Sequence, residues 1–214
     1  MKALIFGSIG TLAETSHLQR KAFNDAFAAH GLNWNWDEDT YATLLRRAGG
    51  RDRIARFAQA QGETVDAASL HKLKSRLFQQ ALARGVSLRP GVAETLALAR
   101  ARGWRLALAT STSAANVDAV LSATGLTRAD FATVLDATHA LPAKPAPDVF
   151  HAALAALDLQ AQDALAIEDN PDGFHAARAA GLACLAVPGA LHATADFSGA
   201  YARQTTLDLS GITL

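Results

Sequence analysis

The apolar residues of this chain are grouped in short continuous runs, and helical patterns lie between the later runs. Continuous rather than alternating apolar runs indicate strands that are covered on both faces, as in a parallel sheet packed between helices. Strands that alternate with helices therefore predict a doubly wound α/β fold. The predicted strands are residues 3–6, 105–109, 133–135, 164–167 and 183–187, and the predicted helices between the later strands are residues 91–102, 113–123, 147–156 and 171–180.

Residues 15–88 interrupt this alternation, because their apolar residues recur at helical spacing and no strand is evident. We expect a cap of four helices here, inserted into an α/β core made of residues 1–14 and 89–214. Two chain crossings between a core and a helical cap form a hinge over the strand ends, a common place for a substrate cleft. The four predicted helices are residues 17–31, 37–50, 51–62 and 66–85.

Charge and composition narrow the possible partners. The 20 Lys and Arg residues balance the 20 Asp and Glu residues, so nothing indicates a nucleic-acid-binding face. No apolar stretch reaches the roughly 20 residues of a membrane span, and we expect no signal peptide. The single cysteine, Cys184, excludes an internal disulfide, which fits a reducing compartment and a cytoplasmic location. We expect an inert thiol, because Cys184 lies in an apolar run.

Polar residues follow the predicted strands. Thr110 and Ser111 precede a helix, where hydroxyls and helix N–H groups can bind an anion, although such residues also cap helices. Lys144 lies on a loop stiffened by flanking prolines, and a solvated surface charge is its alternative interpretation. Glu168 and Asp169 directly follow an apolar strand. Two such carboxylates suit a hard cation such as Mg²⁺, with a helix-capping role for Asp169 or Asn170 as the alternative.

Taken in order, these motifs resemble those of the haloacid dehalogenase (HAD) superfamily, in the branch with a helical cap inserted after the first strand. Residues 107–116 (ALATSTSAAN), 144–150 (KPAPDVF) and 168–181 (EDNPDGFHAARAAG) are similar to its second, third and fourth motifs. The cap stretch 22–57 resembles the sugar-bisphosphate phosphatases of a branch that also includes β-phosphoglucomutase and phosphoglycolate phosphatase. The resemblance covers nearly the whole chain and implies a HAD-like Rossmannoid core.

The resemblance also implies roles for individual residues and a small phosphorylated metabolite as the ligand. Magnesium is the cofactor that the family implies, and we expect it to bind weakly or not at all here. The implied phosphate-binding residues are Thr110, Ser111 and Lys144, the implied substrate residues of the cap are Gly49, Gly50 and Arg51, and the implied metal ligands are Glu168 and Asp169.

The first motif departs from the family pattern D-x-D-G-[TV]. Its first Asp is the family's nucleophile, which forms an aspartyl phosphate, and its second Asp is the general acid/base. Residues 6–12, FGSIGTL, align without a gap and place Gly7 and Ile9 at these two positions. Glycine cannot attack and isoleucine cannot carry a proton, so covalent phosphoryl transfer by a carboxylate is not available. We predict a protein that binds a phosphorylated sugar without this chemistry.

Other interpretations of this loop are weaker. An active Mg²⁺-dependent phosphatase with an unorthodox nucleophile is the main alternative, with Ser8 as the stand-in. Because successive strand residues point to opposite faces, we expect Ser8 to face away from the phosphate. Neither nucleotide-binding glycine loop matches the sequence. The mutase histidine position holds Gln19, so mutase chemistry is not expected. We predict a residual anion site in which Lys144 is also drawn to Asp169.

Overall fold

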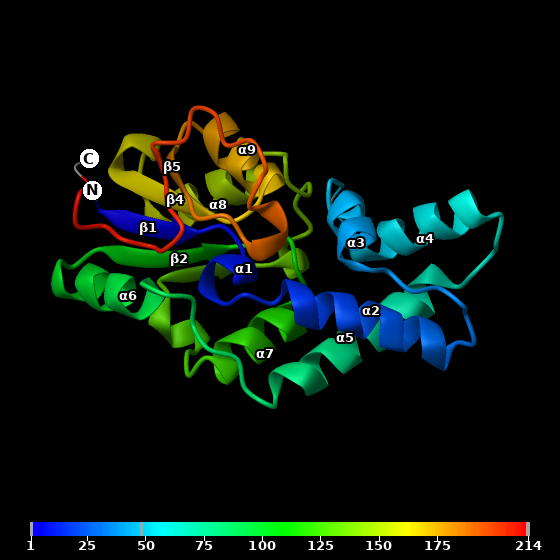
Figure 1. Ribbon diagram of the computed structural model, residues 1–214. Coiled ribbons are helices and arrows are strands. Elements are labelled where there is room, and N and C mark those ends of the chain that lie inside the picture. Colours follow the sequence, from blue (N-terminus) through cyan, green and yellow to red (C-terminus); the bar gives the residue numbers. More distant parts are fainter. Residues whose placement is uncertain (1, 48, 213–214) are drawn as a thin grey trace.

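The computed structural model describes residues 2–47 and 49–212 and is built on a six-stranded sheet (Figure 1). The strand order is β3-β2-β1-β4-β5-β6, and every neighbouring pair is parallel. This confirms the doubly wound α/β fold. The strands are β1 (Ala3–Phe6), β2 (Arg105–Ala109), β3 (Thr133–Leu135), β4 (Ala164–Glu168), β5 (Ala183–Ala186) and β6 (Ala202–Arg203).

The central strand β1 contributes to the core on both faces of the sheet. Leu4 and Phe6 pack with the residues of α6 (Val92–Ala101) and α7 (Ala114–Ala123). The alternate residues Ala3 and Ile5 belong to a second buried cluster, on the opposite face of the sheet. Helices α8 (Asp148–Leu157) and α9 (Pro171–Ala179) supply the rest of that cluster. Because all four β1 residues are fully buried, the strand reads as a continuous apolar run.

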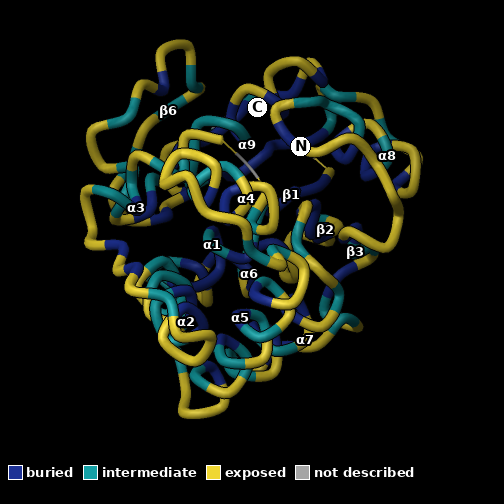
Figure 2. The backbone as a smooth tube through the Cα atoms, turned by 90° about the vertical axis from the view of Figure 1, so that its right-hand side faces the viewer, coloured by how far each residue is buried: buried dark blue, intermediate teal, exposed yellow. Residues whose placement is uncertain are grey.

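Four of the helices between β1 and β2 form a separate lobe (Figure 1). The lobe has its own aromatic core, in which Phe23, Phe27, Trp36 and Tyr41 are at most 2% exposed. Figure 2 shows the burial along the backbone, with the central strands enclosed and the connecting loops exposed. The helices are α2 (Ser16–Ala29), α3 (Glu38–Leu44), α4 (Gly50–Gln61) and α5 (Ala67–Leu82).

The two lobes meet at side chains as well as at the two chain crossings. Gln79 of α5 donates a hydrogen bond from Nε2 to Oδ1 of Asn116 on α7, at 2.9 Å. Leu191, from a 3₁₀ turn of the sheet lobe, packs against the aromatic core of the cap. Arg89, on the returning crossing, donates to the carbonyl oxygens of Gly10, Val187 and Pro188. The returning crossing is therefore fixed to α1 and to the loop that follows β5.

Three details differ from the sequence predictions. The helix predicted at 37–50 ends at Leu44, and Gly50 begins α4 instead of following the preceding helix. The one-turn helix α1 (Ile9–Leu12) was not predicted, because a single turn is too short to show periodicity. The two-residue edge strand β6 lies in the tail. No helix in the described part of the chain is long and apolar enough to cross a membrane.

Candidate functional site

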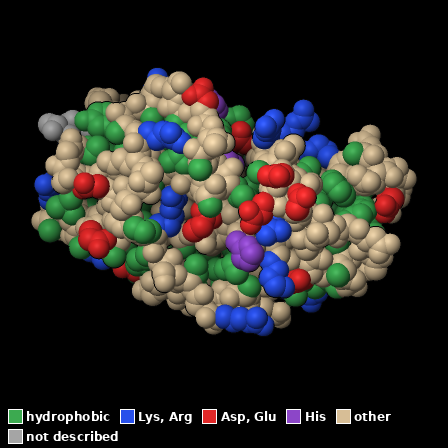
Figure 3. Space-filling view, viewed as in Figure 1, with side chains coloured by type: hydrophobic (Ala, Val, Ile, Leu, Met, Phe, Trp, Pro, Cys, Tyr) green, Lys and Arg blue, Asp and Glu red, His purple; other side chains and the backbone are tan. Residues whose placement is uncertain are grey.

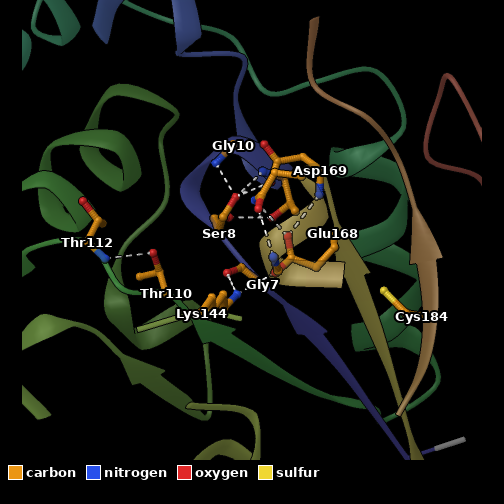
Figure 4. A network of polar contacts seen from close by, with 12 residues as sticks. Gly7, Ser8, Gly10, Thr110, Thr112, Lys144, Glu168, Asp169 and Cys184 are labelled. Carbon is orange, nitrogen blue, oxygen red and sulfur yellow. Dashed lines mark hydrogen bonds and ion pairs between the residues drawn. The ribbon is translucent and has the colours of Figure 1, made fainter. Parts of the chain in front are cut away.

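The predicted site residues of the sheet lobe come together at the carboxyl ends of the central strands (Figure 4). Gly7 follows β1, Thr110 follows β2, and Glu168 is the last residue of β4. Lys144 reaches the same place from the loop before α8. Carboxyl ends of parallel strands form the ligand-binding edge of open α/β sheets. In Figure 3 a notch at the upper edge separates the two lobes, and acidic and histidine side chains are visible beside it.

The carboxylate of Glu168 lies against the backbone of Gly7. A Cβ atom built on Gly7 would lie 1.9 Å from Oε1 of Glu168, and one built on Gly173 would lie 2.0 Å from the same oxygen. Neither distance is possible for a real side chain. The fully buried Glu168 carboxylate therefore occupies space that only two glycines leave open.

Lys144 is the partner of this carboxylate. Its Nζ donates to Oε1 of Glu168 at 2.6 Å and to the carbonyl oxygen of Gly7. The ammonium also lies 4.4 Å from the centre of the Phe150 ring, a cation–π arrangement. Only 7% of Lys144 is exposed, so the surface-charge interpretation is wrong. The ion pair that the structure gives Lys144 is with Glu168, where the sequence had predicted attraction to Asp169.

The second oxygen of Glu168 is also hydrogen-bonded. Its Oε2 accepts from the backbone N–H of Asp169 at 3.1 Å and from Nδ2 of Asn170 at 3.3 Å. Burial raises the pKa of Glu168 to about 7, against the opposing effect of Lys144. Removal from water disfavours the charged carboxylate, and the lysine offsets only part of that penalty.

Ser8 faces the site, so the expectation that it points away is wrong. Its Oγ donates to Oδ1 of Asp169 at 2.6 Å and accepts from the N–H groups of Gly10 and Thr11. Strand alternation does not apply to this residue, because the chain leaves the strand at Gly7 and Ser8 caps the one-turn helix α1. The neighbouring Ile9 is 5% exposed and belongs to the apolar core.

Thr110 and Ser111 differ in accessibility. Thr110 is buried, and its Oγ1 accepts from the N–H of Thr112 at 3.2 Å. Ser111 is exposed. Helix α7 then begins after Ser113, whose side chain accepts from the N–H of Asn116. Thr110 and Ser111 thus lie between a strand end and a helix N-terminus, and Figure 4 shows Thr110 on the side of the site where Lys144 lies.

The predicted cap residues lie at the start of α4. Gly49 has φ +91°, in the region that favours glycine, and Gly50 lies against the His71 ring, where a Cβ would be 2.5 Å from Nε2. Arg51 is exposed and pairs with Asp52 at 3.5 Å. Within residues 2–47 and 49–212, the ion pair of Arg51 goes to Asp52 and not to Lys144 or the strand ends, so the role of these three residues in binding stays a prediction.

Sequence reasoning missed several residues that shape the site. Phe150, whose ring lies beside the Lys144 ammonium, was not identified, and neither were the hydrogen bonds that Ser8 and Asn170 donate to Asp169. Ser8 and Asp169 are 161 residues apart, and a lone Phe on an apolar helix face is too common to identify such contacts. Lys74 was missed as well, because a lysine within a basic helix gives no sign that it is 3% exposed.

Cys184 agrees with its prediction as an inert thiol. It lies in β5 and is fully buried. Burial raises the pKa of the thiol above its ordinary value, so little thiolate is available for chemistry.

The residues present do not fit a magnesium ion. Mg²⁺ requires several oxygen ligands in near-octahedral geometry. Both oxygens of Glu168 and one oxygen of Asp169 already accept hydrogen bonds from protein groups. Across residues 2–47 and 49–212, no group of three or more His, Cys, Asp or Glu side chains is arranged to hold a metal ion.

Comparison with known proteins places the chain in a family. A family model for haloacid dehalogenase-like hydrolases matches residues 1–181. The CbbY protein of Rhodobacter capsulatus is 44% identical over 206 residues, which are 94% of this chain and 91% of that protein. The CbbY protein of Cupriavidus necator is also 44% identical, over 94% of this chain and 83% of its own length.

Solved structures give the same result. The Rhodobacter sphaeroides CbbY structure with phosphate has a TM-score of 0.92 at 38% identity and covers 98% of this chain and 96% of that one. A CbbY variant from the same organism, solved with xylulose-1,5-bisphosphate, has a TM-score of 0.91 at 39% identity over 96% and 94% of the two chains. The β-phosphoglucomutase of Clostridium difficile shares the fold at 18% identity. On the extent of the family match and of these identities, the chain belongs to the haloacid dehalogenase-like hydrolase family.

Proposed function

We propose that this chain binds a small phosphorylated sugar between the cap and the carboxyl ends of the sheet, and that it does not transfer the phosphoryl group through an aspartyl phosphate. One observation carries the proposal: the space beside Gly7, the residue that the family resemblance aligns with the nucleophile, holds the carboxylate of Glu168 in contact with Lys144. The site therefore keeps its lysine and lacks an attacking group.

The binding half of the proposal rests on what the site retains and on its relatives. Thr110, Ser111 and Lys144 supply hydroxyl donors and a cation, the groups that bind phosphate oxygens. Related CbbY structures contain phosphate and xylulose-1,5-bisphosphate. We assign the second half of such a ligand to the cap turn at Gly49, Gly50 and Arg51.

The loss of phosphoryl transfer follows from what the first loop lacks. Removing a catalytic nucleophile lowers the rate by roughly a millionfold in well-studied hydrolases, which is about 8 kcal/mol of barrier. Ile9 is buried among apolar neighbours, so no side chain at the family's acid/base position can donate a proton to a leaving group.

Ser8 is the feature that would favour an active hydrolase with a different nucleophile. Its hydroxyl donates to Asp169, an arrangement in which the carboxylate could accept a proton. However, a serine oxygen has two lone pairs, and here both accept backbone N–H groups, from Gly10 and Thr11. A nucleophile needs a free lone pair, so this geometry favours a capping role.

The test measures binding and turnover on the same protein. Thermal unfolding should shift upward with xylulose-1,5-bisphosphate or inorganic phosphate, since a ligand at 100 times its Kd stabilises by about 2.7 kcal/mol. The shift should be lost in Thr110→Val and kept in Thr124→Val, whose hydroxyl bonds to carbonyls at the far end of α7.

Phosphatase assays with Mg²⁺ on a panel of phosphorylated sugars should show no turnover above background. Turnover that disappears in Ser8→Ala would establish the alternative hydrolase. The absence of any thermal shift with all of these ligands would remove the binding half of the proposal.

A further inference from the structure

We infer that Glu168 is an internal ligand of Lys144. The Glu168 carboxylate fills the place of a side chain at position 7, competes with phosphate for the lysine, and makes phosphate binding independent of Mg²⁺. The inference deepens the proposed function and rests on it, because it concerns the same phosphate site. It assigns Glu168 a role opposite to the metal ligation that the sequence had predicted.

The first step is steric. Oε1 of Glu168 lies 1.9 Å from the Cβ position of residue 7 and 2.0 Å from that of residue 173. Any side chain at position 7 would force Glu168 out of this place, since real Cβ contacts are never so short. The inward position of Glu168 therefore depends on glycine at both residues.

The second step counts the donors of Lys144. An ammonium has three N–H groups. Here one bonds to the carbonyl oxygen of Gly7, one to Glu168, and the ammonium lies over the face of Phe150. Because Lys144 is only 7% exposed and Glu168 holds one of its three N–H groups, a phosphate oxygen that approaches the ammonium competes with Glu168 for it. The Glu168 contact is the one in which an incoming anion meets a like charge.

The third step concerns the metal. Glu168 is fully buried and uses both oxygens within the protein. Asp169 accepts from the Ser8 hydroxyl at 2.6 Å and from Asn170 at 3.1 Å through Oδ1. Ligation of Mg²⁺ by Glu168 would require breaking a buried ion pair, and within the described part of the chain Oδ2 of Asp169 is the one oxygen of the two carboxylates that accepts no hydrogen bond. Lys144 thus neutralises the charge of Glu168, and Ser8 donates a hydrogen bond to Asp169, at the two carboxylates that a divalent cation would otherwise bind.

The change in phosphate affinity when Glu168 is neutralised has the opposite sign for a metal ligand and for a competitor of phosphate. If Glu168 held a metal that binds phosphate, its neutralisation would weaken phosphate binding. If Glu168 competes with phosphate, Glu168→Gln should strengthen it, because the amide keeps the size and loses the charge that holds Lys144. Even with the screening of water, one negative charge about 4 Å from a phosphate dianion weakens its binding by at least about tenfold.

The experiment is calorimetric titration of inorganic phosphate into the full chain, with either EDTA or Mg²⁺ present. The wild type should bind phosphate with a Kd that changes less than about twofold between the two conditions. Glu168→Gln should lower the Kd at least about tenfold, and Glu94→Gln, which makes the same charge change on an exposed residue of α6, should leave it unchanged. Binding by Glu168→Gln alone would also support the competition.

A second variant keeps every charge and tests the steric step. Gly7→Ala places a methyl group where Glu168 now lies, so the carboxylate must leave its present position beside Lys144. We expect Gly7→Ala to gain binding of Mn²⁺, measured by its electron paramagnetic resonance signal, whereas wild type and Gly211→Ala show none. Nothing lies within 4 Å of the Cβ position of Gly211, which makes it a neutral glycine control.

The outcomes separate this inference from the proposed function. Phosphate binding by the wild type that tightens tenfold or more with Mg²⁺, together with weaker binding by Glu168→Gln, would overturn the inference and leave the proposed function standing. Wild-type Mn²⁺ binding with the same affinity as Gly7→Ala would also overturn it. No phosphate binding by either the wild type or Glu168→Gln would overturn both.

Discussion

The two lobes each bury a lysine, and they treat its charge differently. In the sheet lobe, Lys144 is 7% exposed and lies 2.6 Å from the carboxylate of Glu168. In the cap, Lys74 is 3% exposed, and its hydrogen bond at 2.7 Å goes to the neutral amide oxygen of Gln19. The Lys74 ammonium otherwise lies 4.7 and 4.9 Å from the ring centres of Phe23 and Phe78.

The difference shows in the ionisation of the groups. Burial, with the nearby Arg53 charge, lowers the pKa of Lys74 from 10.5 to about 7. In the sheet lobe the perturbed group is instead Glu168, whose pKa is raised to about 7 by burial. Aromatic faces and one amide offset only part of the free-energy cost of burying the Lys74 charge. In the sheet lobe each charge of the ion pair offsets the burial cost of the other, so removing one leaves the other unpaired. Replacing the buried lysine by methionine should therefore lower the free energy of unfolding in the sheet lobe and raise it in the cap.

The largest effect is expected for Lys144→Met. Removing one partner of a buried ion pair leaves an uncompensated charge, which typically destabilises by about 3–5 kcal/mol. We expect a loss of this size in the free energy of unfolding, measured by urea denaturation at pH 7.5. As a control, Lys21→Met removes an exposed lysine that pairs with Asp25 and should change stability by less than about 0.5 kcal/mol. A loss below 1 kcal/mol for Lys144→Met would mean that the pair with Glu168 does not form.

Lys74→Met should instead stabilise the protein. At pH 6 the lysine is charged in the folded state, and within the described part of the chain its hydrogen bond goes to a neutral amide and no carboxylate pairs with it. A methionine of similar length fills the space between Phe23 and Phe78 without a charge. Replacement of buried ionic groups by apolar ones stabilises by about 1–4 kcal/mol in favourable cases. Destabilisation by more than 1 kcal/mol would show that the aromatic contacts compensate the charge fully.

The advantage of Lys74→Met should depend on pH. Because the folded-state pKa of Lys74 is about 7 and the ordinary value is 10.5, the unfolded chain holds more protons than the folded one between these values. Wild-type stability from this group is therefore fully present above pH 10.5, falls progressively as the pH drops from 10.5 to about 7, and stays at its lowest value below about 7. The difference between variant and wild type should shrink by up to about 1.4 kcal/mol per pH unit above 7. A difference that is constant from pH 6 to 9.5 would contradict the lowered pKa.

The sheet could be predicted from the sequence because its strands are buried on both faces. Apolar runs alone identified β1, β2 and β3 with their observed bounds, and β4 and β5 to within one residue. The four cap helices were predicted as well, since each has an apolar face and a polar end. The one-turn helix α1 and the two-residue β6 carry too few residues for any period to appear.

The site was predicted less completely than the fold. Motif order indicated that Gly7, Thr110, Lys144 and Glu168 meet at one edge of the sheet, and they do (Figure 4). Which carboxylate takes Lys144 could not be predicted, because Glu168 and Asp169 are adjacent in the chain and their side chains leave in different directions. That choice depends on the space beside Gly7 and Gly173, which only the three-dimensional packing reveals.

The smallest effect is expected at a second buried polar group of the cap. The indole N–H of Trp36 has no hydrogen-bond partner among the described residues, although the side chain is fully buried. Trp36→Phe removes this unsatisfied donor, a gain of about 1–3 kcal/mol, and leaves a cavity whose cost is of similar size. The two should nearly cancel, so that the free energy of unfolding changes by less than about 1 kcal/mol.

Trp34→Phe is the matched comparison for Trp36→Phe. It makes the same change in volume and also removes a satisfied hydrogen bond, from Nε1 to Glu63 at 3.2 Å. Urea denaturation of both variants separates the contribution of the N–H donor from that of the ring volume, because only Trp34→Phe loses a hydrogen bond. A loss above 2 kcal/mol for Trp36→Phe would mean that its N–H is stabilised by the surrounding aromatic faces. The cap would then compensate a neutral donor in the same way as it compensates the Lys74 cation, with π faces in place of oxygen atoms.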